Sequence, residues 1–290
     1  MTSLRIPSRL ALFFFAYLAF NQTVRAQEMV SFPSLDSGLF SGPTTLRAFL
    51  FKPEGPGPFP AVVGLHGCSG LYDKQGKLFA RETAWAKLLT KQGYVVLFPD
   101  SFGPRNVTTA CADGGLDASP WNERSEDAYG ALLYLQSQPF VIGDRIGLMG
   151  WSHGGGSVAF AVKSTSDARP SKLPKGDFRA AVSFYPGWCS AKFLGSSWTT
   201  DIPFLLEMGK SDDWTVAAPC VDVVQSALER GAPVRMKIYD GAYHDFDWPG
   251  MAVRSFSPRP DKTVHVGMNP EARADALTRV PAFFDEFLKQ

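Results

Sequence analysis

The segment 150–154, with the sequence GWSHG, places Ser152 between glycines directly after the apolar run 145–149. A G-x-S-x-G pattern at the end of a buried strand is typical of a sharp strand-to-helix turn that exposes a nucleophilic serine. Glycines suit such a turn because larger flanking side chains would collide. Ser152 is therefore a candidate nucleophile. A glycine-rich turn that serves only packing is the alternative.

A serine hydroxyl becomes an effective nucleophile when a histidine accepts its proton. His244 is the best placed of the four histidines, because it lies in a loop directly after the strand-like run 234–239. Loops at that edge of a parallel sheet commonly build active sites. The imidazole also needs a carboxylate, and Asp212 and Asp213 follow the run 203–208. We expect Asp212 to orient His244; a histidine that only lies on a surface loop is the alternative.

The resulting chain order of serine, aspartate and histidine is that of α/β-hydrolases. The adjacent Asp213 is expected to cap a helix that begins near Thr215. Asp245 and Asp247 are too close in sequence to His244 to serve it from another loop, so we expect them to bond within their own turn.

An ester-cleaving site needs two backbone N–H groups that stabilise the oxyanion of the tetrahedral intermediate. One comes from the residue after the nucleophile, which is His153. The other comes from a loop after an early strand, and the glycine-lined segment 65–70 follows the run 60–65. We expect the N–H of Cys68 to be the second donor.

Apolar runs of strand length alternate with longer helical patterns along the chain, which predicts an α/β fold. We expect a mostly parallel sheet with helices on both faces, in a single domain that spans residues 27–290. The expected strands are 45–51, 60–65, 94–98, 145–149, 180–184, 203–208 and 234–239. The expected helices are 79–92, 122–138, 157–162, 221–230 and 270–289.

The N-terminus has the pattern of a secretory signal peptide. Arg5 and Arg9 precede the apolar segment 10–20, and Ala26 ends a cleavage-site pattern. We expect residues 1–26 to be removed and the mature protein to be periplasmic or secreted. An uncleaved anchor is the alternative, but the apolar segment is shorter than the roughly 20 residues that span a bilayer.

Export would permit the four cysteines to form disulfides, for which three pairings exist. Cys189 and Cys220 are expected to meet at the active-site face, which leaves Cys68 to pair with Cys111. A zinc site is the competing interpretation, but no C-x-x-C or clustered Cys/His spacing supports it. We expect no metal and no other cofactor.

The composition favours a small-molecule partner. The formal net charge is only +1 over 290 residues, and no basic run is interleaved with aromatic residues. This pattern does not indicate nucleic acid or an anionic membrane surface as a partner. After signal cleavage we expect no stable membrane insertion. Three tryptophans suggest an aromatic-lined pocket, with core packing as the alternative; they are Trp121, Trp188 and Trp214.

From about Thr45 onward, the chain resembles the dienelactone hydrolase family of α/β-hydrolases. The resemblance lies in the segments 65–70, 98–103, 147–155, 184–187, 209–215 and 243–246. It implies an α/β-hydrolase fold and supports Asp212 as the catalytic acid. Founding members use a cysteine nucleophile and carry a carboxylate where Gly67 falls. Arg105 falls roughly where the family binds a substrate carboxylate, with an ordinary solvated arginine as the alternative, and Trp151 is a second candidate substrate contact.

These residues predict an exported hydrolase that cleaves a small carboxylic ester or lactone through an acyl-enzyme. Two alternatives stay open. One is a catalytically silent binding protein on a hydrolase scaffold, since a fold does not guarantee chemistry. The other is a peptidase or acyltransferase that uses the same three residues. The absence of a large accessory domain in the sequence ranks the second below an esterase.

Overall fold

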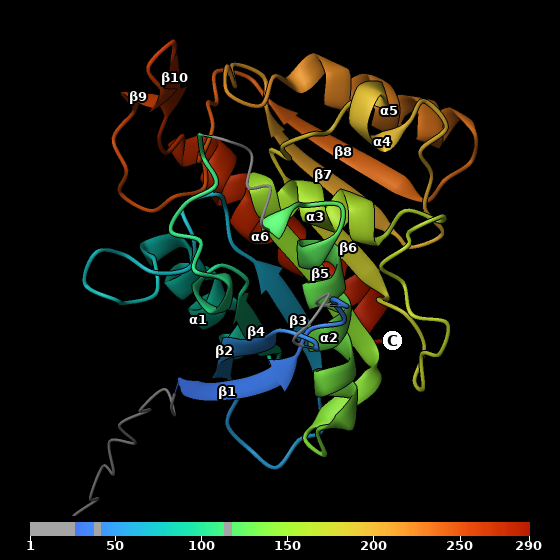
Figure 1. Ribbon diagram of the computed structural model, residues 1–290. Helices are drawn as coiled ribbons and strands as arrows, with labels where there is room; N and C mark the ends of the chain where they lie inside the picture. The colour runs from blue at the N-terminus through green and yellow to red at the C-terminus, as the bar shows by residue number, and fades with distance from the viewer. Residues whose placement is uncertain (1–26, 38–41, 113–117) are drawn as a thin grey trace, which may run out of the picture.

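The computed structural model describes residues 27–37, 42–112 and 118–290; the expected signal peptide at 1–26 lies outside these ranges. Within them, the centre is an eight-stranded sheet in the order β1-β2-β4-β3-β5-β6-β7-β8 (Figure 1). The sheet is parallel from β4 to β8, while β1 and β2 join it as antiparallel strands. The expected α/β fold with a mostly parallel sheet is confirmed. The strands are β1 (Glu28–Pro33), β2 (Thr45–Phe51), β3 (Phe59–Leu65), β4 (Val95–Asp100), β5 (Val141–Trp151), β6 (Ala180–Phe184), β7 (Phe204–Gly209) and β8 (Val234–Tyr239).

Helices cover both faces of this sheet. Helices α2 and α3 pack together in front of β5, whereas α1 and α6 lie on the opposite face (Figure 1). The helices are α1 (Ala80–Lys91), η1 (Gly103–Arg105), α2 (Glu123–Ser137), α3 (His153–Ala161), α4 (Ala191–Leu194), α5 (Ala217–Glu229) and α6 (Pro270–Leu288). Two begin earlier than expected. Helix α3 starts directly after Ser152, and α5 starts three residues before Cys220.

The central strands are hydrophobic on both faces because helices cover them on both sides. All six residues of β4 are buried, as are six of the seven in β3. Because β3, β5, β7 and β8 run parallel to one another, their carboxyl ends lie at one edge of the sheet. The loops that carry the candidate site residues follow these ends.

A second, two-stranded sheet lies beyond the main one and was not expected from the sequence. Strands β9 (Arg254–Arg259) and β10 (Lys262–Val266) form an antiparallel hairpin at the upper left of Figure 1. Most of its residues are exposed or half-buried.

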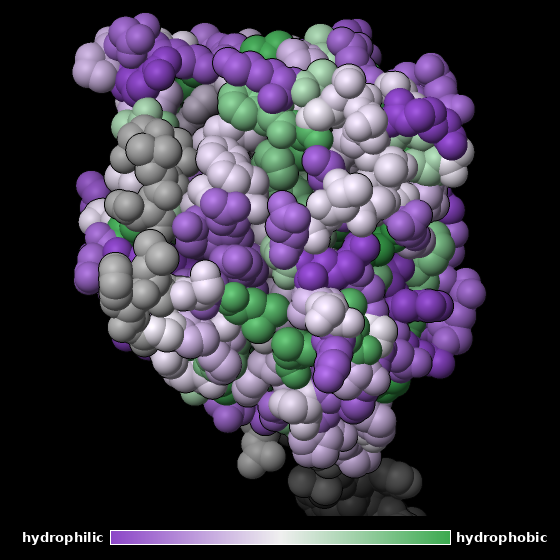
Figure 2. All heavy atoms as spheres, turned by 45° about the vertical axis from the view of Figure 1, so that its right-hand side comes forward, coloured by the Kyte–Doolittle hydropathy of each residue, from purple (hydrophilic) through white to green (hydrophobic). Residues whose placement is uncertain are grey.

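Hydrophobic residues reach the surface in small areas between polar ones on the face shown in Figure 2. Trp121 and Phe193 are the exposed aromatic residues among the described part of the chain. Both line clefts close to the candidate site. No helix among the described residues is long and apolar enough to cross a membrane.

Candidate active site

Ser152 occupies the turn between β5 and α3. Its backbone has φ 53° and ψ −111°, a conformation that residues other than glycine rarely adopt. Holding a residue there costs about 1 to 3 kcal/mol, and such strain is concentrated at functional sites. The turn brings Ser152 to the surface of two cavities, where it remains only 7% exposed.

The neighbouring glycines are required by close backbone contacts. A Cβ on Gly154 would lie 2.1 Å from the carbonyl oxygen of Leu65, and one on Gly150 would lie 2.4 Å from that of Gly154. A Cβ on Gly156 would lie 2.4 Å from the carbonyl oxygen of Gly187. The turn therefore excludes side chains, which is the reason the sequence motif predicts.

Asp212 and His244 meet in the loops that follow β7 and β8. His244 Nδ1 lies 2.7 Å from Asp212 Oδ2, and both side chains are buried. The N–H groups of Trp214 and Thr215 each donate to Asp212 Oδ1 at 2.9 Å. The hydroxyl of Thr215, a residue that the sequence analysis did not single out, lies 2.9 Å from Asp212 Oδ2. These contacts fix the carboxylate toward the imidazole.

The environment of His244 changes its basicity in two opposing ways. Burial alone would lower its pKa, but the charge of Asp212 and their hydrogen bond outweigh this effect. The pKa of His244 is therefore raised above its ordinary value. A cavity of about 30 Å³ brings His244 and Ser152 to one surface.

Asp213 points away from its neighbour Asp212. Its carboxylate accepts the backbone N–H of His265 at 2.8 Å and pairs with His265 Nδ1 at 2.7 Å. The expectation that Asp213 caps the following helix is wrong, because α5 begins after Val216 and has no side-chain cap. Asp213 instead attaches the β9–β10 hairpin to the loop that carries Asp212.

The loop after β3 is held in place by hydrogen bonds that its backbone carbonyl groups accept. The His66 carbonyl accepts from Arg124 at 2.8 Å, that of Gly67 from the His66 ring at 2.8 Å, and that of Cys68 from the Ala110 N–H at 2.8 Å. In the part of the chain that the structure describes, the Cys68 N–H has no hydrogen-bond acceptor. This amide lies on a residue that lines both cavities at Ser152.

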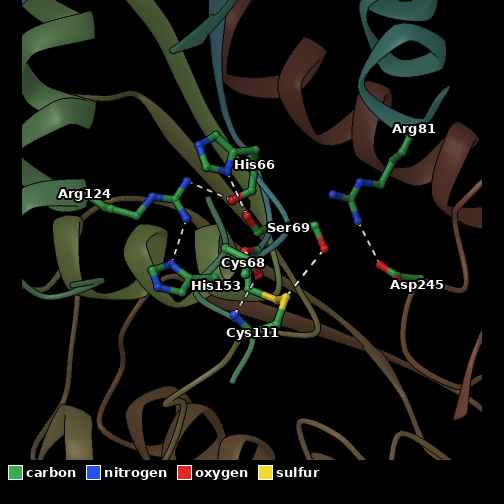
Figure 3. Close-up of a disulfide and its surroundings, with 10 residues drawn as sticks. His66, Cys68, Ser69, Arg81, Cys111, Arg124, His153 and Asp245 are labelled. Carbon is green, nitrogen blue, oxygen red and sulfur yellow. Dashed lines mark hydrogen bonds and ion pairs between the residues drawn. A yellow bond between two sulfur atoms is a disulfide. The ribbon is translucent and has the colours of Figure 1, made fainter. Parts of the chain in front are cut away.

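Both expected disulfide pairings are confirmed. Cys68 bonds to Cys111 across 43 residues, which ties the loop after β3 to the segment that lines the cleft (Figure 3). Cys189 bonds to Cys220 across 31 residues, which joins the loop after β6 to α5. Two disulfides indicate an oxidising compartment.

A cleft of about 610 Å³ opens at Ser152, within the range of small-molecule sites. Trp188 and Trp214 line it, whereas Trp121 lines a separate cleft and contacts the Trp188 ring. The hairpin supplies one wall through Arg259 and Lys262, which the sequence analysis did not single out.

The structure does not bring Arg105 or Trp151 to this cleft. Arg105 Nη2 lies 2.7 Å from the carboxylates of Asp36 and Asp127, and its side chain is only 8% exposed. Its cation compensates two carboxylates that leave water on folding. Trp151 is fully buried and donates through Nε1 to Asp247 at 2.9 Å.

Asp245 and Asp247 make long-range contacts, so the expectation of local turn bonding is wrong. Asp245 pairs with Arg81 at 2.9 Å, across more than 160 residues of sequence. Asp247 accepts from the indoles of Trp85 and Trp151 and from the Tyr185 hydroxyl. These buried contacts anchor the loop that carries His244 to the core.

Comparison with known proteins identifies the family. The model of the dienelactone hydrolase family matches residues 46–288. The chain belongs to the dienelactone hydrolase family. It is therefore a hydrolase, in agreement with the fold.

The curated proteins that the chain resembles are distant relatives. Mouse (Mus musculus) acyl-coenzyme A thioesterase 1 is 36% identical over 113 residues, which cover 38% of this chain and 22% of that protein. Mitochondrial acyl-coenzyme A thioesterase 2 from the same organism is 33% identical over 114 residues, which cover 38% of this chain and 20% of that protein. The chain thus spans about a fifth of the length of these curated relatives.

Solved structures share the fold of this dienelactone hydrolase family member. A dienelactone hydrolase-like promiscuous phosphotriesterase from metagenomic libraries has a TM-score of 0.66 at 19% identity, covering 91% of this chain and 99% of that one. Pyrococcus horikoshii acylaminoacyl peptidase has a TM-score of 0.60 at 20% identity, covering 91% of this chain and 42% of that one.

Proposed function

We propose that the protein hydrolyses small carboxylic esters or lactones through an acyl-enzyme intermediate. The observation that carries this proposal is the buried pair of His244 Nδ1 and Asp212 Oδ2, 2.7 Å apart, whose imidazole shares a cavity surface with Ser152. A serine in a strained turn, a histidine and a buried carboxylate in this arrangement are the components of acyl transfer by a serine nucleophile.

In this mechanism Ser152 Oγ attacks the acyl carbon while His244 Nε2 takes the hydroxyl proton. Asp212 keeps the ring in the tautomer with Nδ1–H and stabilises the cation that forms. The N–H groups of Cys68 and His153 donate to the oxyanion. Collapse of the intermediate breaks the bond to the leaving oxygen, which receives the proton from His244. Water then attacks the acyl-serine by the same route and releases the acid.

The proposed substrate is a small molecule that fits the cleft of about 610 Å³ with Trp188 and Trp214 on its walls. Serine in place of the founding members' cysteine, and glycine at position 67, argue against restriction to dienelactones. No cofactor takes part in the proposed reaction. Export remains part of the proposal: two disulfides support it, and N-terminal sequencing of the mature protein tests cleavage after Ala26.

A fluorophosphonate probe separates an enzyme from a silent binding protein on the same scaffold. We expect covalent labelling of Ser152 in the folded protein, detected by mass spectrometry of the labelled peptide. Parallel assays with an aryl ester, the matching anilide, and the ester with an added alcohol acceptor separate an esterase from a peptidase or an acyltransferase. An unlabelled Ser152 would favour the binding protein, and faster turnover of the anilide would favour the peptidase.

The pH dependence follows from the raised pKa of His244. Since a general base must be unprotonated to accept a proton, activity is lost as the pH falls through this pKa. We therefore expect the acid limb of kcat/KM to lie above pH 6.5, the ordinary value for histidine. A pH profile with a neutral ester checks this. An acid limb at or below pH 6.5 would contradict the coupling to Asp212.

The two disulfides are expected to differ in their effect on catalysis. They close loops of 43 and 31 residues, so each stabilises the fold by a similar amount, about 4 kcal/mol by loop entropy. Only the bond at Cys68 holds a proposed oxyanion donor. We expect Cys68→Ser/Cys111→Ser to lower kcat about tenfold or more, toward the loss seen when one oxyanion donor is removed.

The matched control is Cys189→Ser/Cys220→Ser, measured by thermal melting and by ester turnover at a temperature where both variants are folded. This control should lose stability but keep kcat within about twofold, because Cys189 and Cys220 are buried in the core and neither lines a cavity at Ser152. Equal kcat values for the two double variants would show that the Cys68 N–H is not an oxyanion donor.

A further inference from the structure

Arg124 lies beneath the loop after β3 and is fully buried. It belongs to the first turn of α2, and its guanidinium points toward both segments that carry the proposed oxyanion amides (Figure 3). A buried arginine is uncommon unless it is paired with a carboxylate. No carboxylate lies within 4.0 Å of Arg124 among residues 27–37, 42–112 and 118–290.

The two Nη atoms bind one partner on each side of the proposed oxyanion site. Nη2–H donates to the His66 carbonyl at 2.8 Å, two residues before Cys68. Nη1–H donates to His153 Nδ1 at 2.8 Å. Because a guanidinium has no acceptor, this bond fixes Nδ1 of His153 as the acceptor and places the ring hydrogen on Nε2. One rigid, planar group thus bridges the two segments.

The His66 ring responds to the same cation. Burial lowers the pKa of His66 well below its usual range, and the charge of Arg124 lowers it further. The neutral ring donates from Nδ1 to the Gly67 carbonyl at 2.8 Å and accepts the Ser101 N–H at Nε2. Arg124 therefore helps to keep the ring in the form that holds the turn at Gly67.

The charge of Arg124 is costly in this position. Burial is the largest influence on it and lowers its pKa, with Asp127 and Asp100 giving partial compensation from a distance. A buried ion without a close partner costs several kcal/mol. The cost is offset if negative charge develops nearby during the reaction, because interactions in a low-dielectric interior are weakly screened.

We propose that Arg124 is a positioning residue for the oxyanion site, an inference that rests on the proposed function. It holds the Cys68 loop and His153 at one spacing through its two donors. Its positive charge also lowers the energy of the anionic tetrahedral intermediate relative to the neutral ester. Arg124 does not contact the substrate, so its removal should affect kcat far more than KM.

Arg124→Met tests this, because methionine fills the site without donors or charge. We expect kcat for an aryl ester to fall about 100-fold, as when one oxyanion donor is lost, with KM changed less than about threefold. The affinity for a boronic acid, which forms a tetrahedral anion on serine, should fall in parallel with kcat, whereas the affinity for the neutral alcohol product should not. Arg124→Lys keeps the charge but not the bridging geometry and should lose about tenfold in kcat.

Arg169→Met is the matched control. Arg169 also packs against α2, through the Tyr129 hydroxyl, and pairs with Asp177 far from Ser152. It should lower the melting temperature and leave kcat unchanged. The inference would be overturned if folded Arg124 variants kept their kcat and boronate affinity, or if both variants failed to fold. Either result would leave Arg124 with a structural role only. A wild-type protein without ester turnover or Ser152 labelling would instead refute the proposed function.

Discussion

Ser152→Ala is expected to lower kcat for a short-chain aryl ester by about 10⁴- to 10⁶-fold, the range found when a nucleophilic serine is removed. The reason is that no acyl-enzyme can form without Oγ. Alanine keeps the Cβ at this turn, so the strained backbone and the packing of α3 are unchanged. Stability should therefore stay close to that of the wild type, as measured by thermal melting.

Ser211→Ala serves as the control for Ser152→Ala. Ser211 directly precedes Asp212, and its side chain makes no hydrogen bond among the described residues. The Ser211 variant should keep full turnover and full labelling by a fluorophosphonate. If the Ser152 variant kept turnover within tenfold of the wild type, another residue would be the nucleophile.

Asp212→Asn is expected to lower kcat by about 10⁴-fold, because an amide in this place favours the wrong tautomer of the histidine. The introduced amide would keep the shape of the side chain but lose the charge that raises the pKa of His244. The acid limb of the pH profile should accordingly move to lower pH. Steady-state kinetics of the wild type and of Asp212→Asn, measured from about pH 5 to 8, where histidine titrates, would give both the loss of kcat and the shift of the acid limb.

Asp213, which directly follows Asp212, provides a control with the same change of side chain. Asp213→Asn removes the same charge one position away, where the carboxylate holds His265 at the surface instead of His244. We expect a stability loss below about 1 kcal/mol, as for exposed ion pairs. Its kcat should stay within about threefold, since the β-bridge between His244 and Val266 and the Gly267 N–H still attach the base of the hairpin to the loop of His244. A larger loss of kcat in Asp213→Asn than in Asp212→Asn would show that Asp213, rather than Asp212, orients His244.

Much of the fold was predictable because the strands of the main sheet from β2 to β8 carry either continuous apolar runs or alternating hydrophobic residues. The expected ranges 45–51, 180–184 and 234–239 coincide with β2, β6 and β8. The strands that were missed are of another kind. β1 and the β9–β10 hairpin are exposed and polar along much of their length, and their pairing depends on partners rather than on an apolar run.

The candidate site was predictable to the level of loops but not of side-chain direction. Chain order placed Ser152, Asp212 and His244 at one sheet edge, and their catalytic roles stay predictions. The family resemblance favoured Asp212 over Asp213, but spacing alone could not tell which of the two adjacent aspartates faces inward, since that depends on turn geometry. Nor could it place Arg105 against Asp36, or Arg124 against His66, because these contacts join segments distant in the chain.

The attachment of the hairpin constrains how this protein can acquire new substrates. His244 forms a bridge with Val266, its carbonyl accepts the Gly267 N–H at 2.9 Å, and Asp213 holds His265. The base of the hairpin and the loop of the proposed general base therefore behave as one piece. Grafting a whole hairpin from a relative would disturb both at once, whereas evolution or design can vary the tip at Arg259 and Lys262 without altering the reaction.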